Sequence, residues 1–100
     1  MAHSTLNIND TTKVVYSVTN ANGIMIDEIA ISNKTAGDIT ITILKYNTVS
    51  KVDYTILSPT ILPTGRTFYK TGGYLNNTWS LKITISGGDA DIDFNYTPIY

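Results

Sequence analysis

The segment from Trp79 to Tyr96 constrains the fold most strongly, because its apolar and polar residues are arranged almost symmetrically about Gly87-Gly88. If the two glycines form a two-residue loop, Ile83 faces Ile92, and every apolar residue on one side meets an apolar residue on the other. Glycine readily adopts the positive φ angles that type I′ and II′ turns need. A shift of one residue would turn the apolar set to the wrong face. The segment therefore predicts an antiparallel hairpin with one dry and one polar face, as in a sandwich or barrel.

Elsewhere in the chain, apolar residues recur at a spacing of two and β-branched residues dominate, which favours strands. Turn signals separate short segments at roughly 8–12-residue spacing, which is typical of an all-β sandwich or barrel. The alternation changes parity at Asp27-Glu28, which predicts a β-bulge or a bend between two strands. The strands are expected at residues 5–9, 13–19, 24–33, 39–46, 51–58, 66–71, 79–86 and 90–97.

We expect a single all-β domain over residues 1–100. Its predicted architecture is an antiparallel two-layer β-sandwich of seven to eight strands, either a jelly roll or an immunoglobulin-like fold. Residues 1–6 are expected to form an N-terminal arm. No segment has the periodicity of a helix.

The composition excludes several classes of function. A net charge of -1 argues against binding to nucleic-acid phosphate or to an anionic membrane. The first residues lack a secretory signal and no apolar stretch approaches the length of a spanning helix, so we expect a protein made soluble in the cytoplasm. There is no cysteine for a disulfide or thiolate metal site. Only 15% of residues are charged, and the Thr, Asn and Ser that replace them suit a surface that packs against other protein.

Titratable residues offer two candidates for chemistry. His3 is the only histidine and lies near the chain start, where a positioned catalytic base is not expected, so we predict no enzyme activity. Asp89, Asp91 and Asp93 alternate along one strand face, which is compatible either with a Ca²⁺ site or with a solvated face. The predicted hairpin places Lys82 opposite Asp93, and residues two apart on a strand are separated by about 7 Å, too far for easy chelation. We therefore expect no metal ion and no cofactor.

Aromatic residues are the main candidates for a contact surface. On parity, four of them belong to the core, namely Tyr54, Trp79, Phe94 and Tyr96. Phe68 and Tyr69 are adjacent and must point to opposite faces. We expect an interface that includes Leu6, Tyr69, Tyr74 and Tyr100, since tyrosine is enriched in interface cores, although single exposed aromatics are ordinary.

Several segments together resemble a known class. They are a short Ser/Thr/Asn-rich start, the segment Ile29-Ala30-Ile31-Ser32-Asn33-Lys34-Thr35, the crossing Ile61-Leu62-Pro63-Thr64-Gly65 and the closing segment Trp79 to Tyr96. Over nearly its whole length the chain resembles small β-sandwich virion proteins of tailed bacteriophages, which act as capsid decoration (cement) proteins or as neck and tail accessories. The class has no catalytic residues.

The resemblance implies a partner and a location. The expected partner is the major capsid protein or another virion protein, and the expected location is the virion after synthesis in the host cytoplasm. A homo-oligomer is implied, and a trimer in particular, because capsid lattices offer threefold positions. The alternative is a carbohydrate-binding or fibre/tail accessory module. A row of exposed aromatic residues on one sheet would favour that alternative, while symmetric copies joined by apolar contacts would favour the decoration protein.

Overall fold

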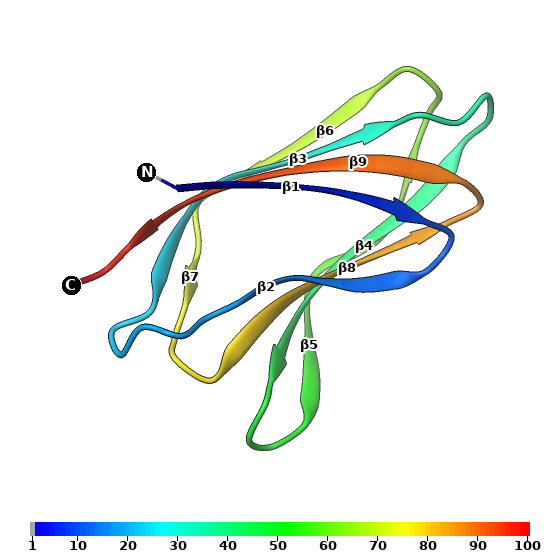
Figure 1. Cartoon of the computed structure of the whole chain (residues 1–100). Helices are drawn as coiled ribbons and strands as arrows, with labels where there is room; N and C mark the ends of the chain where they lie inside the picture. Colours follow the sequence, from blue (N-terminus) through cyan, green and yellow to red (C-terminus); the bar gives the residue numbers. More distant parts are fainter. Residues whose placement is uncertain (1) are drawn as a thin grey trace.

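The structure is a computed structural model that describes residues 2–100, and it consists of two antiparallel sheets packed as a β-sandwich (Figure 1). The all-β prediction is confirmed. No helix in this part of the chain is long and apolar enough to cross a lipid bilayer. The described residues form nine strands: β1 (Ala2–Asn9), β2 (Thr12–Ser17), β3 (Ile24–Asn33), β4 (Ile39–Asn47), β5 (Val52–Leu62), β6 (Thr67–Thr71), β7 (Tyr74–Leu75), β8 (Trp79–Ser86) and β9 (Asp89–Pro98).

The strand count differs from the expected seven to eight because of β7, which has two residues and is too short to produce a period-two pattern. The five-stranded sheet has the order β1-β9-β3-β6, with β7 also paired to β3, and the four-stranded sheet has the order β2-β8-β4-β5. β1 pairs with β9 in the five-stranded sheet, and β2 pairs with β8 in the four-stranded sheet. The start and the end of the chain therefore run side by side in both sheets (Figure 1). This order is that of a jelly roll, one of the two expected architectures.

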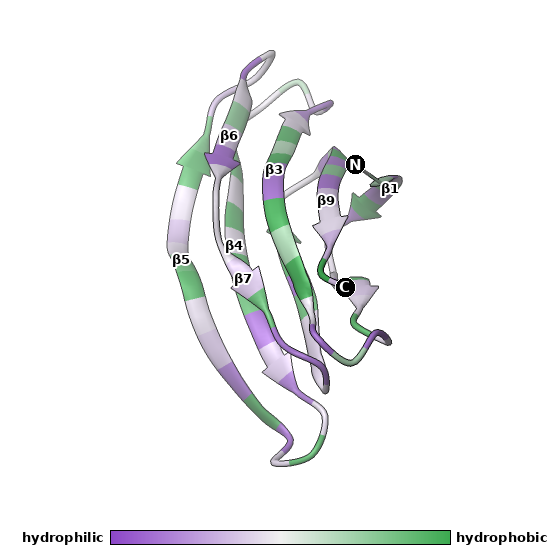
Figure 2. Ribbon diagram, turned by 90° about the vertical axis from the view of Figure 1, so that its left-hand side faces the viewer, coloured by the Kyte–Doolittle hydropathy of each residue, from purple (hydrophilic) through white to green (hydrophobic). Residues whose placement is uncertain are grey.

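The core lies between the sheets and is rich in isoleucine. In β4, Ile39, Ile41 and Ile43 are all buried, while the threonines between them face outward. Green bands recur along β3 and β4 in Figure 2, and purple interrupts them in β3. The parity change in β3 is a bulge, the first of the two predicted alternatives, since the pairing with β9 shifts between Ile26 and Glu28. The bulge lets both halves of β3 keep their isoleucines in the core.

The predicted hairpin from Trp79 to Tyr96 is wrong, because β8 and β9 belong to different sheets. Ile83 and Ile92 are both buried, but they do not pair. Ile83 pairs with Ile43 in the four-stranded sheet, and Ile92 pairs with Ile31 in the five-stranded sheet. The matched alternation is equally satisfied when two apolar faces oppose each other across a core, so it does not distinguish this arrangement from side-by-side pairing.

The two glycines at this corner have different roles. Gly87 has a φ of 90°, a conformation that favours glycine. At Gly88, by contrast, a Cβ atom would clash with the side chain of Thr35. Thr35 Oγ1 approaches closely enough to accept a hydrogen bond from the Asp89 N–H at 2.7 Å. Gly88 therefore allows the β8–β9 corner to pack against the loop that follows β3.

The expected N-terminal arm at residues 1–6 is also wrong for the residues that the structure describes; Met1 lies outside them. β1 is an integral edge strand, and it pairs with β9 from Ala2 opposite Tyr96 to Asn9 opposite Asp89. Its even-numbered residues face inward, where Leu6 packs against the core and Ile8 is fully buried. The strand expected at residues 5–9 therefore begins earlier, at Ala2, because an edge strand covered on one face needs few apolar side chains.

Candidate functional site

The residues expected to form an interface are not gathered on one surface. Tyr69 is 62% exposed on the outer face of the five-stranded sheet, whereas Leu6 faces the core from the opposite edge of the same sheet. Tyr100 lies beyond β9 and is 99% exposed. Tyr74 lies in β7, at the edge that carries the groove described below. The interface role of these four residues stays a prediction.

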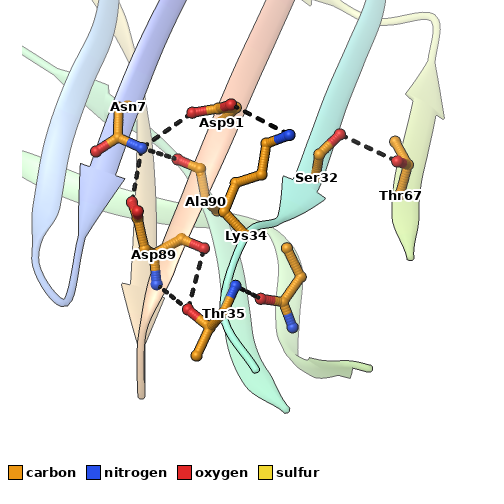
Figure 3. A network of polar contacts seen from close by, with 9 residues as sticks. Asn7, Ser32, Lys34, Thr35, Thr67, Asp89, Ala90 and Asp91 are labelled. Carbon is orange, nitrogen blue, oxygen red and sulfur yellow. Dashed lines mark hydrogen bonds and ion pairs between the residues drawn. The ribbon is translucent and has the colours of Figure 1, made fainter. Parts of the chain in front are cut away.

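The alternating aspartates lie on the outer face of β9, where a side chain from β1 forms hydrogen bonds with two of them. The Asn7 amide nitrogen donates hydrogen bonds to Asp89 Oδ1 at 2.6 Å and to Asp91 Oδ1 at 2.9 Å (Figure 3). It also donates to the carbonyl oxygen of Ala90 at 3.3 Å. The amide group thus occupies the space between the two carboxylates and supplies the positive end of a dipole to both.

Basic groups complete this polar network. The Lys34 ammonium lies 3.7 Å from Asp91 Oδ2 (Figure 3), and His3 Nε2 lies 3.0 Å from Asp93 Oδ1. The expected pair of Lys82 and Asp93 does not form, because the two strands lie in different sheets. Within residues 2–100 no group of three or more His, Asp or Glu side chains is arranged to hold a metal ion. A wide depression of about 440 Å³ lies over this face, and its lining includes the paired groups Asn7, Asp91 and Asp93.

A different site lies at the open edge of the sandwich, between β5 on one side and β6 with β7 on the other. This edge groove has a volume of about 180 Å³ and adjoins a smaller depression of about 80 Å³ with which it shares Lys45 and Tyr74. The lining residues are Ile26, Lys45, Ile56, Lys70, Gly72, Gly73 and Tyr74, with Leu75, Asn76 and Trp79 in the smaller part.

The edge groove adjoins a stretch of core-facing surface that no strand covers. The β4–β5 hairpin extends beyond the end of the sandwich (Figures 1 and 2). Tyr54 pairs with Lys45, which in turn pairs with the fully buried Leu81, so these residues face the core side of the sheet. Tyr54 is nevertheless 47% exposed and Val52 44%. The side chain of Tyr54 therefore faces the core side of the sheet, as predicted, but it is not buried in the core.

Aromatic rings surround this uncovered surface. The Tyr54 and Trp79 ring centroids are 5.3 Å apart at an interplanar angle of 56°, a favourable tilted arrangement. The Lys45 ammonium lies 4.9 Å from the Trp79 ring centroid, within range of a cation–π interaction. Tyr74 donates a hydrogen bond to the Asn22 carbonyl oxygen at 2.9 Å, which fixes its position at the groove.

Sequence reasoning missed this groove, although one signal pointed to it. Lys45 continues the inward series that begins with Ile39, and a lysine in such a position is unusual because its ammonium must stay hydrated or paired. The second lysine, Lys70, lies on another strand and pairs with the fully buried Ile29. Only the packing of the two sheets brings both lysines to one groove.

Inside the sandwich a second aromatic cluster contains a perturbed tyrosine. The Tyr16 ring lies 4.4 Å from the Tyr96 ring and 5.8 Å from the Phe94 ring, between centroids. Burial, followed by the interaction with Tyr96, raises the pKa of Tyr16 above its usual value. A raised pKa keeps the phenol of Tyr16 protonated and uncharged. Tyr16 and Tyr96 pack against the hydrophobic core.

Comparison with known proteins gives one structural likeness. No protein-family model matches the chain, and no curated protein matches its sequence. The crystal structure of PirA superimposes with a TM-score of 0.49 at 10% sequence identity, over 95% of this chain and 91% of that chain.

Proposed function

We propose that this protein is a non-enzymatic structural protein of a virion, of the capsid decoration (cement) type, which attaches to a protein shell through the uncovered end of its four-stranded sheet. The observation that supports the proposal is the core-facing surface around Tyr54, Val52 and Trp79, which continues beyond the sandwich. Val49, in the turn of the same hairpin, is 75% exposed. When another protein covers apolar side chains in these positions, the free energy of the complex is lowered.

The remainder of the surface suits the same role. Apolar burial contributes about 25 cal/mol per Å², and tyrosine and tryptophan are the residues most enriched among interface hot spots. The turn of the same hairpin carries Asn47, Thr48 and Ser50, whose uncharged side chains cost less to desolvate than ions. A standard interface of about 1,600 Å² in total would suffice for attachment. We further propose a homo-oligomer, a trimer in particular, from the resemblance to decoration proteins.

The test combines co-sedimentation with the capsid shell and mass measurement in solution by light scattering. We expect Tyr54→Ser to abolish co-sedimentation and to leave the circular dichroism spectrum unchanged. Tyr69→Ser is the matched comparison, because Tyr69 is an exposed tyrosine on the outer face of the other sheet and belongs to the interface predicted from the sequence. If the Tyr54→Ser variant still sediments with the shell, or if only the Tyr69→Ser variant fails to do so, attachment does not use this end of the sheet.

A carbohydrate-binding or fibre accessory module is the second candidate, and the aromatic rings around the edge groove favour it. Sugars stack on tyrosine and tryptophan faces, and Trp79, Tyr54 and Tyr74 all adjoin the groove. A panel of immobilised glycans distinguishes the two functions. A monomer that binds one glycan through Trp79, with loss of binding in Trp79→Ala, would establish this alternative in place of shell attachment.

A further inference from the structure

Two lysines from opposite sheets line the edge groove, and no carboxylate in residues 2–100 lies within ion-pair distance of either. Lys45 is on β4 and Lys70 on β6, both at core-facing positions. The ion pairs of the described chain involve other cations, namely His3, Lys34 and Lys82. Two of the seven Lys and Arg residues of the chain therefore lie at this groove, although the chain as a whole has a net charge of -1.

The charge of this groove favours an anion as its occupant. Both side chains are half-buried, and removing an ammonium group from water carries a penalty unless the charge is paired. Two like charges beside the same low-dielectric groove also repel each other. The interaction of Lys45 with the Trp79 ring offsets part of this cost for one lysine only. An apolar residue at either position would be the ordinary choice for a core-facing strand site, so the pair of lysines points to a negatively charged occupant.

The strands beside the groove indicate the shape of that occupant. β5 and β6 are edge strands of their respective sheets, so each has a side whose backbone N–H and C=O groups lack a partner in its own sheet. Extended peptides bind at such edges by adding a strand, with alternate side chains entering the adjoining pocket. Ile56 and Tyr74 in the groove, with Trp79 in the adjoining depression, offer apolar and aromatic surface to the aliphatic part of such side chains.

We propose that the edge groove binds an extended segment of a partner protein and that an acidic side chain of this segment lies between Lys45 and Lys70. The inference rests on the proposed attachment to another protein and names the chemistry of the contact. Each ammonium donates a charge-assisted hydrogen bond to the carboxylate, a stronger interaction than one between neutral groups.

The test is a selection from a library of displayed heptapeptides. The full-length protein is the bait, and the double variant Lys45→Gln/Lys70→Gln serves for counter-selection. Enriched peptides are then synthesised and titrated against the protein, with the fluorescence of Trp79, the only tryptophan, as the readout. Circular dichroism checks that each variant is folded.

We expect the enriched peptides to share an Asp or Glu at one position. Replacing that residue with Asn or Gln, or making either single Lys→Gln change in the groove, should raise Kd about tenfold or more. Lys13→Gln is the control, because it changes the net charge by the same amount. Lys13 lies on β2, where its ammonium donates to the Asn7 carbonyl oxygen, and this variant should bind as tightly as the wild type.

Enrichment of neutral peptides that bind the lysine variants equally well would overturn the acidic contact and leave attachment to protein standing. If no peptide is enriched and glycans bearing a carboxylate bind instead, both the peptide and the shell attachment are overturned in favour of the carbohydrate-binding function. If neither peptides nor glycans bind, the acidic contact is overturned, and co-sedimentation alone decides the proposed attachment.

Discussion

At the scale of single residues, burial on the inner face should control stability more strongly than charge on the outer face. Ile83 is fully buried, and Ile83→Ala should lower the free energy of unfolding by about 2–5 kcal/mol. Lys82, its neighbour on the outer face, lies 3.2 Å from Asp53 and 4.1 Å from the Tyr46 ring centroid. These contacts are partly exposed, so Lys82→Ala should cost only about 1 kcal/mol. Urea unfolding measures both, and equal costs would contradict this assignment of faces.

A second residue-scale prediction concerns Tyr16. Burial, and next the interaction with Tyr96, raises its pKa, so above pH about 10 the unfolded chain loses this proton before the folded protein does. The contribution of Tyr16 to the free energy of unfolding is fully present below pH about 10 and is lost as the pH rises through the raised pKa. We expect Tyr16→Phe to show a shallower loss of stability than the wild type in urea unfolding from pH about 9 to 11. Identical pH dependence in the two proteins would contradict a raised pKa.

At the scale of elements, β1 should be required for the fold. Deleting residues 1–8 removes the fully buried Ile8 and exposes the backbone of β9, so Tm should fall by at least about 10 °C. His3→Ala is the control on the same strand, because His3 lies on the outer face with its side chain 54% exposed. Differential scanning calorimetry measures both variants. An unchanged Tm after the deletion would mean that β1 is a detachable arm.

At the scale of the whole molecule, the topology should make folding slow. β1 and β9 come from opposite ends of the chain, and they must meet before the five-stranded sheet is complete. Closing such long loops loses entropy before any contact compensates for it, and folds dominated by distant pairings fold in about milliseconds to seconds. Stopped-flow refolding followed by Trp79 fluorescence tests this. A single phase in the microsecond range would contradict it.

The sequence by itself determined which side faces the core in the strands with a clear alternation. Alternation in β4 and β9 predicted their buried faces, and the parity change at Asp27-Glu28 predicted the bulge. These properties are local, since burial with a period of two follows from the geometry of one strand. The same local reasoning placed Asp89, Asp91 and Asp93 on one face of β9, as the structure shows.

Only the tertiary structure decided which strands pair and which core-facing residues are covered. The pattern around Gly87-Gly88 is equally satisfied by two strands side by side and by two strands opposed across a core. Tyr54 has the parity of a core residue, yet it is exposed because the other sheet ends before reaching it. Lys45 and Lys70 share a groove only because β4 and β6 lie in sheets that pack together. Alternation records the direction of a side chain, whereas pairing, coverage and convergence depend on where the other strands lie.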